Sequence, residues 1–375
     1  MKVVFLSNFL LHHQTEYCEE MYSLCKGNFF FVATSSITEE RKKLGYHDYT
    51  NDGIPYYIDG TDEANRDRIT ALIRDADAVM IGSAPWHWVE KRVIENKLVY
   101  IYSERIFKSF IASMKAILKG TVSKRYVIPG RLENVKLFCA SAYLPGEMRA
   151  LRTFRGRMYR WGYFPPLYSK SEPFAHDIPT ILFAGRLIPF KRPWYTLHLA
   201  KVFKDKGIEA KFIIIGIGET EEKLKSYAHK HGLMDRVTFT GAMPPHEVRR
   251  YMEQADIFLF TSTKGEGWGA VLNEAMNSSC AVVASSRIGS VPFMVKHGEN
   301  GLIFRDGSFR DFQSQVLSLC RNPELTKSLG EKAYKAVASK WNGKTAAQRF
   351  VTLTEHFLEG KDSPFDDGPC SKLEA

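Results

Sequence analysis

The sequence predicts an α/β protein built from two doubly wound parallel sheets. Apolar runs of strand length alternate with amphipathic stretches of helix length along the whole chain, a pattern typical of parallel strands joined by helical crossovers. The chain has 375 residues, about two and a half times the usual length of one domain. Clustered prolines near its middle predict a linker, because they continue neither helix nor strand. We therefore expect two domains.

The strand candidates fall into two sets that flank this linker. In the first half they are residues 3–6, 29–33, 78–81, 98–102 and 137–140, with a helical stretch over 64–74. In the second half they are 180–184, 210–215, 237–240, 257–261 and 281–285, with helices near 194–206, 220–231, 245–254 and 270–277. Ligands of open α/β sheets bind beyond the carboxyl ends of the strands, so two such domains facing each other place a ligand in a central cleft.

These patterns give the following expected domain boundaries. The first domain covers 1–165, the linker 166–177, and the second domain 178–345. A terminal helix over 346–361 is expected to pack back on the first domain. The tail over 362–375 contains Gly, Pro and four acidic residues, which predicts a mobile end.

Composition excludes several classes of protein. Hydrophobic residues make up 44% and charged residues 25% of the chain, as in soluble globular proteins. Every apolar run is too short to span a bilayer, and residues 1–8 resemble a first strand more than a signal peptide. The six cysteines are scattered without a Cys-x-x-Cys pair, which favours buried thiols. We expect a cytoplasmic protein.

The formal net charge of +10 is concentrated in one segment. Residues 105–160 contain thirteen Lys or Arg against Glu133 and Glu147. Apolar residues at helical spacing over 107–118 alternate with Arg105, Lys108, Lys115 and Lys119, which predicts a basic amphipathic helix. This helix either packs on its own sheet as an ordinary crossover, or attaches to an anionic membrane surface or lipid-linked acceptor. No nucleic-acid-binding motif accompanies the charge, so we expect no nucleic-acid partner.

The most informative stretch is residues 264–276, which follow a predicted strand. A loop with three glycines turns there and a helix begins, so unpaired backbone N–H groups point toward the ligand edge of the sheet. Glu266 lies in the loop and Glu274 about one turn inside the helix. The sequence thus predicts an anion-binding loop flanked by two carboxylates.

Glu266 and Glu274, separated by seven residues, reproduce a known motif. They resemble the Glu-x7-Glu motif of group 1 retaining glycosyltransferases of the GT-B fold. Further matching marks follow in the order of that family: Phe183-Ala184-Gly185-Arg186-Leu187 with Lys191, Ile215-Gly216-Ile217-Gly218, Phe239-Thr240-Gly241, Gly289-Ser290-Val291-Pro292 and Gly298-Glu299-Asn300-Gly301. Together these marks cover residues 178–305, and as an ordered set they are specific.

The resemblance implies a donor site for a nucleotide sugar. Arg186 and Lys191 would neutralise the diphosphate, Glu274 would bind the ribose and Glu266 the transferred sugar. Two fixed cations and backbone amides stabilise a departing diphosphate, so neither a metal nor another cofactor is expected. The implied donor-binding positions are Gly185, Gly216, Gly218, Gly267, Trp268, Gly269, Ala270, Val271 and Glu274.

The amino-terminal half departs from the family pattern. A glycine-rich loop often follows the first strand in the family, whereas this chain has Ser7 to Gln14. The family often carries a His after a later strand, where this chain has Glu104. His13, His87 and Glu104 are therefore competing candidates for the polar group at the reacting centre.

We predict a retaining, metal-independent glycosyltransferase of hexosyltransferase type. It would move a sugar from a nucleotide-diphosphate sugar to a hydroxyl of a saccharide or lipid-linked acceptor, as in cell-surface polysaccharide or glycolipid assembly. Two alternatives remain. One is another sugar-nucleotide enzyme on the same fold, an epimerase or phosphorylase, and the other is a non-catalytic nucleotide-sugar-binding subunit.

Overall fold

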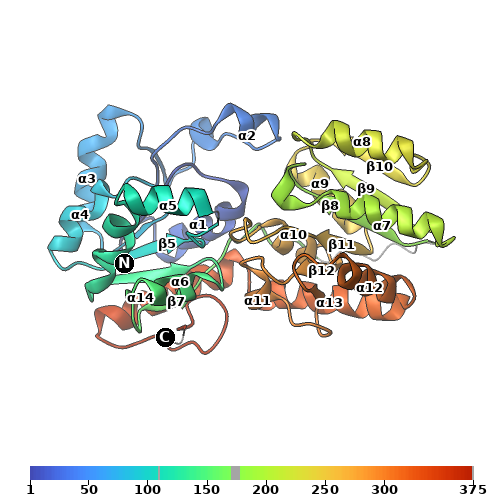
Figure 1. Ribbon diagram of the computed structural model, residues 1–375. Helices are drawn as coiled ribbons and strands as arrows, with labels where there is room; N and C mark the ends of the chain where they lie inside the picture. The colour runs from blue at the N-terminus through green and yellow to red at the C-terminus, as the bar shows by residue number, and fades with distance from the viewer. Residues whose placement is uncertain (109, 170–177, 374–375) are drawn as a thin grey trace. The chain divides into compact units, whose positions relative to one another are not determined.

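The computed structural model describes residues 1–108, 110–169 and 178–373. The chain divides into two compact units (Figure 1). The first comprises residues 1–42, 47–166 and 340–375, and the second 43–46 and 167–339. Each unit contains a parallel sheet with helices, which confirms the predicted α/β class.

The first unit contains a seven-stranded sheet with the order β3-β2-β1-β4-β5-β6-β7, and its paired strands are parallel. The strands are β1 (Val3–Ser7), β2 (Phe29–Ala33), β3 (Tyr57–Asp59), β4 (Ala78–Ile81), β5 (Val99–Ser103), β6 (Val135–Cys139) and β7 (Met158–Arg160). The helices of this unit include α1 (His12–Leu24), α2 (Glu39–Lys43), α3 (Arg66–Asp75), α4 (His87–Ile94), α5 (Phe110–Leu118), α6 (Leu144–Ala150) and α14 (Gly343–Leu358).

The second unit contains a six-stranded sheet with the order β10-β9-β8-β11-β12-β13. Its strands are β8 (Thr180–Ala184), β9 (Lys211–Ile215), β10 (Val237–Gly241), β11 (Ile257–Phe260), β12 (Ala281–Ser285) and β13 (Leu302–Phe304). Its helices include α7 (Trp194–Asp205), α8 (Glu221–Lys230), α9 (Pro245–Glu253), α10 (Val271–Asn277), α11 (Val291–Met294), α12 (Phe309–Cys320) and α13 (Pro323–Ser339). A short 3-10 helix, η5 (Pro189–Lys191), precedes α7.

Both strand orders contain a point at which the sheet reverses direction. In the first unit this point lies between β1 and β4, and in the second between β8 and β11. The loops that leave the carboxyl ends of these strands diverge to opposite faces of the sheet, and the opening between them is where doubly wound sheets bind ligands. The fold thus marks one candidate ligand edge in each unit.

The core of the first unit depends on the last long helix of the chain. Helix α14 packs against α1. The Tyr100 ring stacks on Phe138 with centroids 4.7 Å apart, and Phe350 of α14 lies 5.0 Å from Tyr100. The Tyr100 hydroxyl lies 2.9 Å from Oγ1 of Thr354. Residues 340–375 therefore complete the first unit although they follow the second in sequence.

The carboxy-terminal tail differs from the mobile end that the sequence predicts. The backbone N–H of Arg160 donates to Ser371 at 2.8 Å, and that of Leu373 donates to Met158 at 2.8 Å. Cys370 is fully buried. Described tail residues thus cover the outer edge of β7, whose backbone groups would otherwise lack partners on that side. Composition could not reveal this because the bonds involve the backbone.

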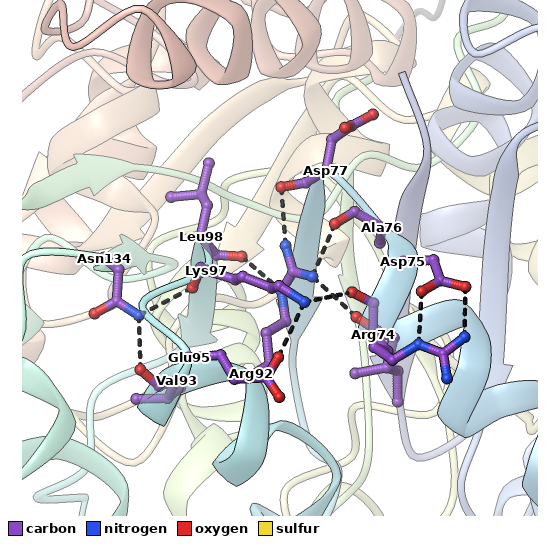
Figure 2. Close-up of polar contacts among 11 residues, drawn as sticks. Arg74, Asp75, Ala76, Asp77, Arg92, Val93, Glu95, Lys97, Leu98 and Asn134 are labelled. Carbon is purple, nitrogen blue, oxygen red and sulfur yellow. Dashed lines mark hydrogen bonds and ion pairs between the residues drawn. The ribbon is translucent and has the colours of Figure 1, made fainter.

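A buried arginine joins several loops at the amino ends of β4 and β5 (Figure 2). Arg92 of α4 is 2% exposed and donates from Nη1 to the carbonyls of Ile73 and Ala76, at 2.9 and 2.8 Å. It also donates to Asp77 at 2.9 Å and to Leu98 at 3.1 Å. Burial lowers the pKa of Arg92 to about 10, so the guanidinium stays charged at neutral pH. One side chain thereby connects the end of α3 with the starts of two strands.

Candidate functional site

The candidate site of the second unit lies at the carboxyl ends of β8 and β11. Gly185 and Arg186 directly follow β8, and the loop from Thr261 to Ala270 connects β11 with α10. These strands are neighbours at the reversal point of the sheet. The sheet order therefore brings together motifs that are more than seventy residues apart in the sequence.

Glycines allow the loops after β8 and β9 to touch. Gly216 has φ 128°, and a Cβ there would lie 2.1 Å from the carbonyl oxygen of Gly185. The N–H of Leu187 donates to Ile217 at 2.9 Å. A side chain at Gly216 would separate the two loops. This explains the glycine in the Gly216-x-Gly218 pattern without assigning it a ligand contact.

Lys191 is held against the loop that follows β11. The Thr261 hydroxyl donates to the Lys191 carbonyl at 2.7 Å. The N–H of Thr263 donates to the Phe190 carbonyl at 2.8 Å. Because both bonds involve the backbone of η5, they fix where the lysine side chain begins.

Lys191 and Glu266 form an ion pair in this loop. Nζ of Lys191 contacts Oε2 of Glu266, and the two side chains are only 14% and 12% exposed. The Ser262 hydroxyl donates to the same oxygen at 2.9 Å. Two residues that the sequence assigns to different parts of one ligand thus touch each other directly. Partial burial strengthens this contact relative to a surface pair.

The remaining donor positions surround this pair along the chain. Gly267 to Ala270 continue the loop, Val271 is the first residue of α10, and Glu274 lies in its first turn. Gly269 has φ 84°, and a Cβ there would lie 2.3 Å from the Phe260 ring. The Trp268 side chain is fully buried, so it supports the loop from inside the unit.

Three polar residues that sequence reasoning did not assign stabilise this loop. Besides Ser262, Asn273 accepts a hydrogen bond from Nε1 of Trp268 at 2.9 Å. The Ser290 hydroxyl donates to the Trp268 carbonyl at 2.7 Å. Ser290 belongs to the Gly289-Ser290-Val291-Pro292 mark, so its position in a motif was the available signal. Ser262 and Asn273 had no signal beyond nearness to the glutamates.

The structure connects two of the three competing candidates in the first unit. The His13 and Tyr163 rings lie 4.5 Å apart, and the Tyr163 hydroxyl donates to Glu104 Oε1 at 2.9 Å. Glu104 also pairs with Lys108. Burial, together with the nearby charges of His12 and Arg41, holds the pKa of His13 well below its ordinary value. His87 is exposed on α4, where its ring contacts Trp88.

The basic segment is not a single charged face. Arg105 and Arg157 are buried, and Arg157 donates to the carbonyls of Val135 and Gly130 at 3.0 and 2.6 Å. Arg125 donates to Ala84 at 2.8 Å. The exposed cations of the segment are Lys115, Lys119, Lys124, Arg131, Arg149, Arg152 and Arg155. Several arginines therefore serve the fold, and the surface charge is smaller than the sequence suggests.

Exposed apolar side chains accompany the lysines of α5. Met114 is 43%, Ile117 48% and Leu118 78% exposed. Lys115 and Lys119 lie beside them and are also exposed. The side chains of 109–112 and 116, which the amphipathic pattern includes, lie outside the described residues. The described residues of α5 thus present both apolar and basic side chains at the surface.

Neither a membrane span nor a metal cluster is found among the described residues. Within 1–108, 110–169 and 178–373, every helix is too short or too polar to cross a bilayer. The same ranges contain no group of three or more His, Cys, Asp or Glu that could hold a metal ion.

The two parallel, doubly wound sheets define a protein of the GT-B fold class. A crystal structure of HepE from Anabaena in complex with UDP aligns over 96% of this chain and 100% of its own, with a TM-score of 0.70 and 15% identity. Residues 166–336 match the family described as group 1 glycosyl transferases. The matching stretch contains the motifs on which the resemblance rests, so the match confirms the resemblance seen in the sequence.

Curated relatives extend the family comparison. An uncharacterised glycosyltransferase of Methanocaldococcus jannaschii is 28% identical over 236 residues, covering 62% of this chain and 61% of the relative. A GDP-mannose-dependent α-(1-6)-phosphatidylinositol monomannoside mannosyltransferase of Mycobacterium tuberculosis is 28% identical over 191 residues, covering 49% and 48%. The chain thus spans about half to three fifths of the length of these relatives.

Proposed function

We propose that the chain is a retaining, metal-independent glycosyltransferase that uses a nucleotide-diphosphate sugar as donor. The acceptor is a hydroxyl of a saccharide or of a lipid-linked sugar, and the enzyme works in the cytoplasm. The observation that carries the proposal is the Lys191–Glu266 pair at the reversal point of the second sheet, within the residues that match the family. A relative's dependence on GDP-mannose and UDP in the HepE crystal both support a nucleotide donor.

Transfer requires the bond between the anomeric carbon and the diphosphate oxygen to break. Negative charge then develops on the departing diphosphate, and Arg186 and Lys191 would stabilise it by charge-assisted hydrogen bonds. The acceptor oxygen forms the new bond on the same face, and its proton passes to an oxygen of the departing phosphate. This route keeps the sugar configuration and needs neither a metal nor a protein nucleophile.

A thermal-shift screen tests the proposal directly. Uridine, guanosine and adenosine diphosphates and their sugars would be added in turn, because a ligand that binds the folded chain raises its melting temperature. We expect one base to stabilise the second unit, and its sugar to be consumed when a saccharide acceptor is present. Stabilisation without consumption would instead favour a nucleotide-sugar-binding subunit, and an isomerised donor would favour an epimerase.

Glu274 is predicted to bind the ribose of the donor. Replacing it by glutamine removes a charged hydrogen-bond acceptor, so affinity for the free nucleoside diphosphate should fall by about tenfold or more. Calorimetry measures this affinity directly. Glu266→Gln is the matched comparison, because we expect it to slow transfer without weakening the affinity for the free nucleoside diphosphate. Unchanged nucleotide affinity in Glu274→Gln would contradict the ribose assignment.

We further propose that α5 attaches the first unit to an anionic lipid surface. The exposed Ile117 and Leu118 would insert among headgroups while Lys115 and Lys119 face lipid phosphates. One relative is a phosphatidylinositol monomannoside mannosyltransferase, and its name supports a lipid-linked acceptor.

Flotation with vesicles tests this attachment. We expect recovery with acidic vesicles at low salt and its loss as the screening length falls from about 30 Å at 0.01 M to about 8 Å at 0.15 M. The combined change of Lys115, Lys119 and Lys124 to Gln should release the protein. The control changes Lys206, Lys223 and Lys230, exposed lysines of the second unit, to Gln. Equal recovery with acidic and neutral vesicles would contradict the proposal.

A further inference from the structure

The ion pair between Lys191 and Glu266 joins two side chains that are each proposed to bind a different part of the donor. Both side chains are largely shielded from water, and they form an ion pair with each other. Under the proposed function, on which this inference rests, the diphosphate would recruit the lysine. Its ammonium would then leave Glu266 for the phosphate oxygens, at least in part.

Recruitment of Lys191 changes the surroundings of Glu266. The carboxylate keeps the Ser262 hydroxyl, which donates to it at 2.9 Å. It loses a cation at a position only 12% exposed. Losing an ionic contact is unfavourable for a shielded carboxylate unless new hydrogen-bond donors replace that contact. Hydroxyls of the transferred sugar are such replacements, whereas a free nucleoside diphosphate lacks that sugar.

We propose that Glu266 is a specificity-determining residue that sets the preference for the nucleotide sugar over the free nucleoside diphosphate by competing with the diphosphate for Lys191. When the donor binds, two new contacts replace the internal ion pair. Lys191 contacts the diphosphate, and a hydroxyl of the transferred sugar donates to Glu266. After transfer the sugar is gone, and re-formation of the pair promotes release of the nucleoside diphosphate. Ser262 is a positioning residue that holds the carboxylate in both states.

This competition predicts that loss of the Glu266 carboxylate increases the affinity for the free nucleoside diphosphate. Glu266→Gln removes the internal rival for Lys191, so it should tighten binding of the free nucleoside diphosphate by about five- to tenfold. The same change should weaken binding of the nucleotide sugar relative to the free nucleotide. The probe is the nucleoside diphosphate that stabilises the unmodified chain in the thermal-shift screen, and calorimetry measures its dissociation constant.

A double-mutant cycle separates exchange from simple charge repulsion. If the higher affinity for the nucleoside diphosphate depends on Lys191, then Glu266→Gln should not tighten binding in a chain that already carries Lys191→Met. If the affinity still rises in the chain without Lys191, then Glu266 merely repels the diphosphate. That result would overturn the inference. Glu266→Ala serves as a second variant, because loss of the carboxylate is all that the argument requires.

Asp306→Asn is the matched control. Asp306 pairs with Arg192, the residue next to Lys191, with Nη1 and Oδ1 2.5 Å apart. Loss of this carboxylate should leave nucleotide affinity within about twofold of the unmodified chain, as expected for a carboxylate that does not compete for the lysine. Tightening in Asp306→Asn equal to that in Glu266→Gln would overturn the inference.

Failure of the inference is distinguishable from failure of the proposed function. If the unmodified chain binds a nucleoside diphosphate but Glu266→Gln and Glu266→Ala bind it equally or more weakly, the exchange is wrong and the donor site stands. If neither the unmodified chain nor any variant binds uridine, guanosine or adenosine diphosphate, both are overturned. The expected result is tighter binding of the free nucleotide combined with slower transfer.

Discussion

Replacing either Arg186 or Lys191 by alanine is expected to lower the turnover number by about two to three orders of magnitude. Each change removes a cation that the family pattern directs at the departing diphosphate. Charge on that group is larger in the transition state than in the bound donor, so the loss falls on the chemical step. Steady-state assays at saturating donor measure it, and circular dichroism verifies that the fold is kept.

Lys206→Ala provides the control for these two variants. Lys206 is an exposed lysine that caps the end of α7, and its replacement should leave the turnover number unchanged. The donor-site assignment would be contradicted by a turnover number within a few-fold of the unmodified chain in both Arg186→Ala and Lys191→Ala. An equal loss in Lys206→Ala would indicate a general effect of charge instead.

Much of the fold could be predicted because its signals are local. Buried parallel strands such as β2 and β8 are continuous apolar runs, and the sequence gives their limits as 29–33 and 180–184, the same as in the structure. Strands β3, β7 and β13 escaped prediction because three residues carry too little periodicity. The tail escaped because its pairing with β7 uses backbone groups, which composition does not encode.

In the candidate site, the sequence identified the residues but not the contact between them. Motif order was enough to nominate Lys191 and Glu266, which lie 75 positions apart in the sequence. Their direct contact depends on the neighbouring positions of β8 and β11 in the sheet, which no local pattern states. The count of Lys and Arg overestimates the surface charge of residues 105–160, because Arg105 and Arg157 are buried and the sequence does not show this.

Arg92 is another residue whose importance the sequence conceals, and its replacement by leucine should have the largest effect on stability. Leucine keeps much of the apolar volume but leaves the carbonyls of Ile73, Ala76, Asp77 and Leu98 without this donor. An unsatisfied buried polar group costs about 1–3 kcal/mol. Water that reaches some of the four carbonyls reduces their combined cost, so we expect the free energy of unfolding to fall by about 3–5 kcal/mol.

Arg74→Ala is the matched control for this change, and Figure 2 shows both arginines. Arg74 is 59% exposed and pairs with its neighbour Asp75 at 2.7 Å, so its loss should change stability by at most about 0.5 kcal/mol. Hydrogen exchange followed by mass spectrometry reports on each unit separately. In Arg92→Leu, amides of β4 and β5 should lose protection while those of β8 and β11 keep it. Equal protection of β4 in the two variants would show that the four carbonyls find other partners and that Arg92 is dispensable for the first unit.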